Sequence, residues 1–114
     1  MAWKENEGTA WTWYRGKWHG GNPMIMGPTT HGPWLGSCVF DGGRAFEGVA
    51  PDLDQHCQRI VRSAESFGLQ VLKQAGEIEE ITREGIGKFP KGAELYLAWV
   101  DSGLASDEIA AAAV

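Results

Sequence analysis

Cysteine, long apolar runs and basic residues are all scarce in this chain, and each scarcity excludes a class of protein. Two cysteines in 114 residues are too few for a disulfide-stapled scaffold. No apolar stretch approaches the roughly 20 residues that span a membrane. Acidic residues outnumber basic ones by 15 to 10, and the formal net charge is -5. We therefore expect neither nucleic acid nor a membrane as a partner.

The sequence also lacks the usual signatures of leader peptides, metal sites and nucleotide-binding loops. Residues 1–7 are charged and contain no apolar segment of the kind found in secretory signals, so we expect a cytoplasmic protein with reduced thiols. The three histidines are scattered and no C-x-x-C pair is present, so a metal site is not expected. Gly85-Ile86-Gly87 is a lone G-x-G inside a helical pattern and has no cofactor meaning by itself.

Glycine, in contrast, is abundant, with 16 residues in 114 against a usual share of about 7%. Most of the glycines lie in the first half, where they indicate strands joined by turns and tight loops. The length and the 43% apolar content are typical of one globular domain. We expect a flexible N-terminus over residues 1–10, an α+β domain over 11–100 and a divergent C-terminal tail over 101–114. The four alanines of that tail are compatible with a weak helix.

Alternating apolar residues and the positions of turn residues predict short strands in the first half of the chain. Trp11-Thr12-Trp13 begins a hairpin that turns at Arg15-Gly16-Lys17. Met24-Ile25-Met26 is a second, shorter strand candidate. A third strand is predicted from Cys38 to Phe46, with a break or bulge at Gly42-Gly43.

The remaining non-helical segments are a loop and a last strand. Thr29 to Ser37 is rich in glycine, proline and histidine and indicates an ordered loop or a single helical turn. Ala93 to Val100 alternates as a strand, and Tyr96 is predicted on the face opposite its apolar side. The residues that share the apolar side are Ala93, Leu95, Leu97 and Trp99.

Two segments show helical spacing. The first begins after Asp52, a candidate N-cap with Gln55 placed as in a capping box, and Gly68 marks its end. Its apolar stripe comprises Leu53, Cys57, Ile60, Val61, Ala64 and Phe67. A second helix is predicted from Ala75 to about Lys88, weakened near its end by two glycines. Together these elements predict an α+β fold, in which two helices pack on a small antiparallel or mixed sheet.

Two arginines are candidates for binding an anion. Arg59 lies on the first helix beside a core position, and Arg44 lies on the glycine-interrupted strand. Taken alone, each is more simply explained as a surface charge that is paired or solvated. A guanidinium fork, however, matches phosphate or carboxylate bidentately, and Gly42 and Gly43 would allow a ligand to approach the backbone.

Three segments in register carry a resemblance to a known family. Gly36 to Arg44, His56 to Ala64 and Leu95-Tyr96-Leu97 resemble motifs of the form G-x-S-V-F-[ED]-G-x-R, H-x-x-R-L-x-x-S-A and Y-I-R. These motifs belong to the small N-terminal domain of class IV (fold type IV) pyridoxal-phosphate aminotransferases, the branched-chain amino acid type in particular. The resemblance covers roughly residues 11 to 97.

The resemblance implies a cofactor, substrates and roles for individual residues. The cofactor would be pyridoxal phosphate, and Arg59 matches the arginine that holds its phosphate. Phe40, Gly42 and Arg44 match the strand that lines the substrate pocket, and Tyr96 matches a tyrosine that faces the same pocket. The substrates of the intact enzyme would be an amino acid and a 2-keto acid. Members of the family are dimers, so a homo-oligomer is expected.

The departures from the family pattern leave an alternative open. The family's Schiff-base lysine lies in a second, larger domain, and none of the five lysines of this chain has the matching context. Ala98 replaces the arginine of Y-I-R, and Leu35 stands where branched-chain enzymes carry a tyrosine. We expect that this 114-residue chain alone does not transaminate. The alternative is a non-catalytic α+β module that binds a small anion or a protein partner.

Overall fold

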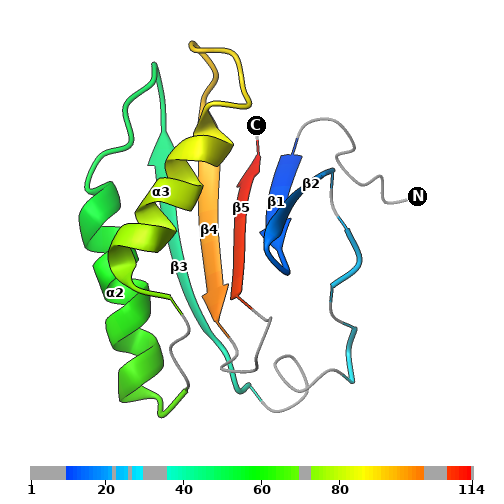
Figure 1. Ribbon diagram of the computed structural model, residues 1–114, viewed down its shortest axis with the longest axis vertical. Helices are drawn as coiled ribbons and strands as arrows, with labels where there is room; N and C mark the ends of the chain where they lie inside the picture. Colours follow the sequence, from blue (N-terminus) through cyan, green and yellow to red (C-terminus); the bar gives the residue numbers. More distant parts are fainter. Residues whose placement is uncertain are drawn as a thin grey trace.

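The computed structural model describes residues 10–21, 23–25, 27–29, 36–69, 73–101 and 108–113 of the chain. Within these ranges the elements follow the chain as strands and helices (Figure 1): β1 (Ala10–Tyr14), β2 (Lys17–Gly20), β3 (Val39–Ala45), α2 (Leu53–Ser66), α3 (Ala75–Ile86), β4 (Leu95–Asp101) and β5 (Glu108–Ala113). Neither of these helices is both long and apolar enough to cross a membrane.

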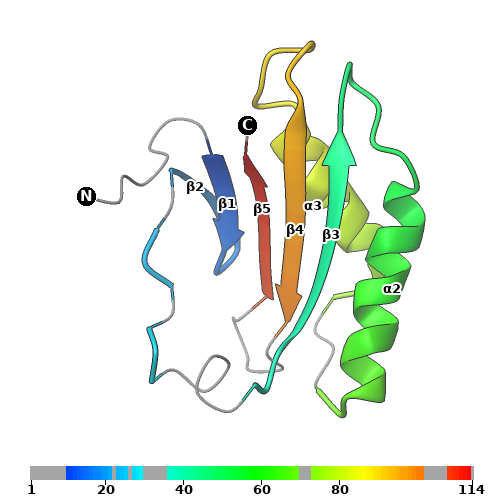
Figure 2. The ribbon, with the colours of Figure 1, turned by 180° about the vertical axis from the view of Figure 1, so that it is seen from behind.

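The strands form one five-stranded sheet in the order β2-β1-β5-β4-β3, and every neighbouring pair is antiparallel. Helices α2 and α3 lie together on one face of the sheet, as Figure 1 shows from the front. The view from behind shows the opposite face with no described helix over it (Figure 2). The predicted α+β class is therefore confirmed, and the described sheet is antiparallel throughout.

The prediction of a weak helix in the tail is wrong, because residues 108–113 form strand β5 between β1 and β4. Alanine has the highest helix propensity, but a helix of six residues is only marginally stable by itself. Pairing satisfies the backbone of β5 on both sides, since Trp13 and Trp99 both align with Ala110. Tertiary pairing therefore overrides local propensity in this segment.

The predicted N-terminal hairpin is confirmed. Strands β1 and β2 are joined by Arg15 and Gly16, whose φ angles are 53° and 81°, and Tyr14 pairs with Lys17. Two successive residues with positive φ make the tight turn whose twist matches that of the flanking strands. Glycine at the second position adopts this conformation without the strain that a Cβ would add.

Two other strand predictions need correction. Met24 and Ile25 are irregular, with Met24 almost fully exposed, and Met26 lies outside the described residues, as do residues 30–35 of the predicted loop. Strand β3 is continuous, and its pairing with β4 shows no break or bulge at the two glycines. Gly43 has a different role, since a Cβ there would lie 3.3 Å from the rings of both His56 and Trp99.

Helix α2 begins and ends close to the predicted positions, but its first turn differs from the prediction. Asp52 is the N-cap residue with a left-handed backbone (φ 55°) and makes no side-chain cap, so the predicted capping box with Gln55 is wrong. Gly68, with φ 81°, ends the helix as predicted, and the Leu69 N–H donates to the Ala64 carbonyl at 2.9 Å. Helix α3 ends at Ile86, slightly before the predicted end.

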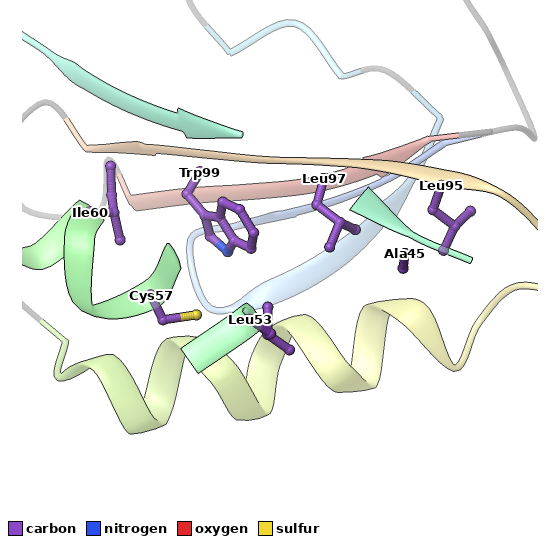
Figure 3. Packing of buried hydrophobic residues seen from close by; sticks show 7 residues of the cluster. All are labelled: Ala45, Leu53, Cys57, Ile60, Leu95, Leu97 and Trp99. Atoms are coloured by element: carbon purple, nitrogen blue, oxygen red, sulfur yellow. The ribbon is translucent and has the colours of Figure 1, made fainter. Parts of the chain in front are cut away.

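The hydrophobic core lies between the sheet and the two helices. Its buried members come from β3, α2 and β4 (Figure 3): Ala45, Leu53, Cys57, Ile60, Leu95, Leu97 and Trp99. The alternation predicted for β4 is thus confirmed. Phe67, predicted on the apolar stripe of the first helix, is instead 55% exposed because it lies at the C-cap. Both cysteines are free thiols, and burial raises the pKa of Cys57 to about 11.

Candidate functional site

The four predicted substrate residues lie on β3 and β4 at positions that alternate with the buried ones. They are therefore on the face of the sheet away from the core, which no described helix covers (Figure 2). Phe40, Gly42 and Arg44 alternate along β3 with Asp41, Gly43 and Ala45, whose positions face the helices. The register pairs Arg44 with Tyr96 and Gly42 with Ala98. Because directly paired residues share a face, the structure brings together two segments that are more than 50 residues apart in the sequence.

The contacts on this face are aromatic and cationic. The Arg44 guanidinium carbon lies 4.9 Å from the centre of the Tyr96 ring, a cation–π distance. Arg44 also approaches Glu94, with 3.9 Å between Nη2 and Oε2, and both side chains are more than half exposed. An exposed ion pair of this length contributes little to stability. The Tyr96 ring therefore gives Arg44 a preferred position on the face without removing its charge from solvent.

The Phe40 ring lies beside Gly42, which has no side chain. A Cβ built on Gly42 would lie 3.3 Å from the Phe40 ring, which means that the ring already occupies the space beside the glycine. Phe40 and Tyr96 are 66% and 63% exposed, unusually high values for aromatic residues in adjacent strands. Together with Gly42 they make an apolar surface beside the Arg44 charge.

Arg59 lies apart from these four residues, on helix α2 and on the helix-facing side of β3. Its Nε donates to Asp41 Oδ2 at 2.5 Å, and its Nη2 donates to Asp41 Oδ1 at 2.8 Å. The Arg59 side chain is still 56% exposed, whereas that of Asp41 is 4% exposed. The structure thus divides the predicted site residues into a group on the open face and an arginine anchored beside the edge strand β3.

Asp41 and His56 were not predicted as part of this site, although both lie within the motif segments. His56 Nδ1 is 2.9 Å from Asp41 Oδ1 and 3.0 Å from Arg59 Nη2. The hydrogen bond from Arg59, reinforced by that from His56, lowers the pKa of Asp41 against the opposing effect of burial, and Asp41 in turn raises the pKa of Arg59. The available signal was the i, i+3 spacing of His56 and Arg59, which places both on one side of a helix.

The His56 ring is held in place by two neighbours. It stacks on Trp99 with ring centres 5.7 Å apart and an angle of 17° between the planes. The ring also lies close to Gly43, where a Cβ would come within 3.3 Å of it. Trp99 is itself fixed, since its Nε1 donates to Thr82 Oγ1 at 2.9 Å. Among the described residues, no group of three histidine, cysteine or acidic side chains is placed to hold a metal ion.

Comparisons with known proteins return aminotransferases. No protein-family model matches the chain. A probable branched-chain-amino-acid aminotransferase of Rickettsia bellii is 33% identical over 76 residues, which are 66% of this chain and 26% of that protein. The crystal structure of an aminotransferase from Brucella abortus, bound to the cofactor PLP, superimposes with a TM-score of 0.82 and 37% identity over 93% of this chain.

A more distant structure has the same fold. The branched-chain aminotransferase of Thermoproteus uzoniensis, solved with norvaline, gives a TM-score of 0.75 at 23% identity over 93% of this chain. In all these comparisons the chain spans less than half of the other protein: 42% of the Brucella abortus chain and 40% of the Thermoproteus uzoniensis chain.

Proposed function

This chain is similar, in sequence and in fold, to the small domain of the class IV aminotransferases of the branched-chain type, and we propose that it serves as that domain. Its task would be to hold the phosphate of pyridoxal phosphate and to form one wall of the substrate pocket, while an amino group passes between an amino acid and a 2-keto acid. The supporting observation is that Phe40, Gly42, Arg44 and Tyr96 lie together on one exposed face.

The geometry of Arg59 fits a phosphate ligand. A guanidinium has five N–H donors, and Asp41 accepts one from Nε and one from Nη2. The remaining donors belong to a side chain that is more than half exposed. A permanently charged, anchored group with spare donors is suited to a dianion. We therefore assign the cofactor phosphate to Arg59.

The open face supplies the substrate contacts in this proposal. Phe40 and Tyr96 would pack on an apolar substrate side chain, and Arg44 would present a positive charge beside them. Ala98 stands where the family carries an arginine, so the face has one cation fewer than the family pattern. The same exposed aromatic residues support the predicted association of this face with another chain or domain, a homo-oligomer included.

The cofactor, when bound, supplies the electron sink that allows a proton to leave the α-carbon of an amino acid. In this proposal the residues of this chain bind the cofactor and orient the substrate, and two of the described lysines lie away from the substrate face. Lys73 lies 5.3 Å from the Trp13 ring centre and Lys88 lies 4.7 Å from that of Trp11, on the side of the sheet opposite Tyr96.

We expect the purified 114-residue chain to show no transamination when it is given pyridoxal phosphate, a branched-chain amino acid and a 2-keto acid. Transamination needs an amine that carries the substrate and moves its α-proton, and the chain offers none in the matching context. Product would be followed by chromatography, with a full-length branched-chain aminotransferase as positive control. Formation of the new amino acid above the level of a chain-free blank would contradict this expectation.

The assignment of Arg59 predicts a preference for the phosphorylated cofactor. The chain should bind pyridoxal phosphate more tightly than pyridoxal, and Arg59→Ala should weaken binding of the phosphorylated form at least about tenfold while leaving pyridoxal unaffected. Affinities would be measured by the change in cofactor absorbance or by calorimetry.

Arg62→Ala is the matched control, because it removes the same charge from an exposed position one turn along the same helix. An equal loss of affinity for pyridoxal phosphate in both variants would show that binding depends only on the net charge of the chain. If inorganic phosphate binds as tightly as pyridoxal phosphate, the alternative of a small-anion-binding module is favoured instead.

A further inference from the structure

One edge of the Arg59 guanidinium is fixed, while the side chain remains 56% exposed. Asp41 receives hydrogen bonds from Nε at 2.5 Å and from Nη2 at 2.8 Å, the parallel two-bond geometry that sets the plane of the guanidinium as well as its position. An arginine on an exposed helix surface would otherwise populate many rotamers. Here the buried Asp41 carboxylate, fixed in a sheet strand, selects one orientation.

His56 supports the same carboxylate. His56 Nδ1 lies 2.9 Å from Asp41 Oδ1 and 3.0 Å from Arg59 Nη2. Because a carboxylate only accepts hydrogen bonds, the bond to Asp41 places the proton on Nδ1, and Arg59 Nη2 then donates to Asp41 Oδ1 and not to the histidine ring. With that proton in place, Oδ1 receives donors from both His56 and Arg59. The histidine ring cannot swing away easily, because it stacks on Trp99 and abuts the backbone of Gly43.

We propose that Asp41 and His56 are positioning residues that aim the outer edge of Arg59, the Nη1 side, at the cofactor phosphate. This inference rests on the proposed function of Arg59. It explains why the strand carries an acid at 41 and a residue without a side chain at 43: the acid orients the arginine, and the glycine makes room for the histidine. An oriented arginine loses less conformational freedom when the anion arrives, so the anion binds more tightly.

The first test examines Arg59 in the free chain. NMR of arginine-labelled protein would measure the hydrogen exchange of each Nε–H. We expect the Arg59 signal to exchange at least about tenfold more slowly than that of exposed Arg62, and Asp41→Asn to bring it to the Arg62 rate. Equal rates in the wild-type chain, or an unchanged Arg59 rate in the variant, would overturn the inference.

A pair of histidine variants distinguishes positioning from simple structural support. In His56→Asn the amide nitrogen replaces Nδ1 and can still donate to Asp41, whereas in His56→Gln the amide lies near the Nε2 position. Both variants lose the stacking on Trp99 and should lose similar stability in thermal unfolding. We expect slow Arg59 exchange to persist in His56→Asn and not in His56→Gln. Equal exchange in the two variants would assign His56 a structural role only.

The second readout is the ratio of affinities for pyridoxal phosphate and pyridoxal. Asp41→Asn and His56→Gln should each reduce this ratio by roughly 2- to 10-fold, and His56→Asn should restore it. If Arg59→Ala removes the preference and Asp41→Asn leaves it intact, positioning is overturned. If Arg59→Ala leaves the preference for pyridoxal phosphate intact, or if the wild-type chain has no such preference, the proposed function fails. In that case the exchange rate of the Arg59 Nε–H still decides whether Asp41 holds Arg59.

Discussion

The variant Ala111→Pro is expected to abolish the cooperative unfolding transition of the chain. Ala111 lies in strand β5, opposite Thr12 of β1 and Ala98 of β4. A strand with neighbours on both sides uses every N–H in one ladder or the other, and proline has none to give. The hairpin of β1 and β2 is joined to the rest of the described sheet only through β5, so a defect there separates the sheet into two parts.

Two separated parts are not expected to remain folded, because a two-stranded hairpin alone is marginally stable and the whole domain has only roughly 5–15 kcal/mol of net stability. Thermal unfolding followed by circular dichroism would measure the loss. Ala111→Ser is the matched control, since serine keeps the N–H and nearly the same volume. An Ala111→Pro chain that unfolds at the temperature of the serine variant would show that β5 is not a central strand.

The variant Gly85→Val is expected to lower the free energy of unfolding by about 3 kcal/mol, the upper part of the range for overpacking. Gly85 is buried in helix α3 beneath Trp18 of strand β2. A Cβ at this position would lie 2.6 Å from Cζ2 of Trp18 and closer still to Cη2. The indole must then move, and with it the edge strand. Valine and glycine are both weak helix formers, so propensity contributes little to the difference.

Gly76→Val provides the control within the same helix. No atom lies within 4 Å of the position that a Cβ at Gly76 would occupy, so this substitution should change the free energy of unfolding by no more than about 0.5 kcal/mol. Urea unfolding of both variants and the wild type would give the two differences. Similar losses at positions 85 and 76 would contradict the close contact between helix α3 and Trp18.

Sequence motifs and periodicity predict part of the candidate site. Phe40, Gly42 and Arg44 share a face because side chains along a strand alternate with a period of two residues. Tyr96 lies beside Arg44 because of the register of β3 against β4, and no local sequence pattern predicts that register. The pairing of Asp41 with Arg59 likewise depends on how helix α2 packs on the strand. The roles of the five predicted residues in binding remain predictions.

The amino-acid sequence by itself determined the elements whose causes are local: the turn at Arg15 and Gly16, the apolar face of β4 and the glycine that ends helix α2. Only the tertiary structure decided that an alanine-rich segment becomes the central strand β5 and that Gly43 and Gly85 serve close packing rather than bulging or unwinding. The physical reason is that backbone pairing and side-chain contact between distant segments outweigh propensities of at most about 1 kcal/mol per residue.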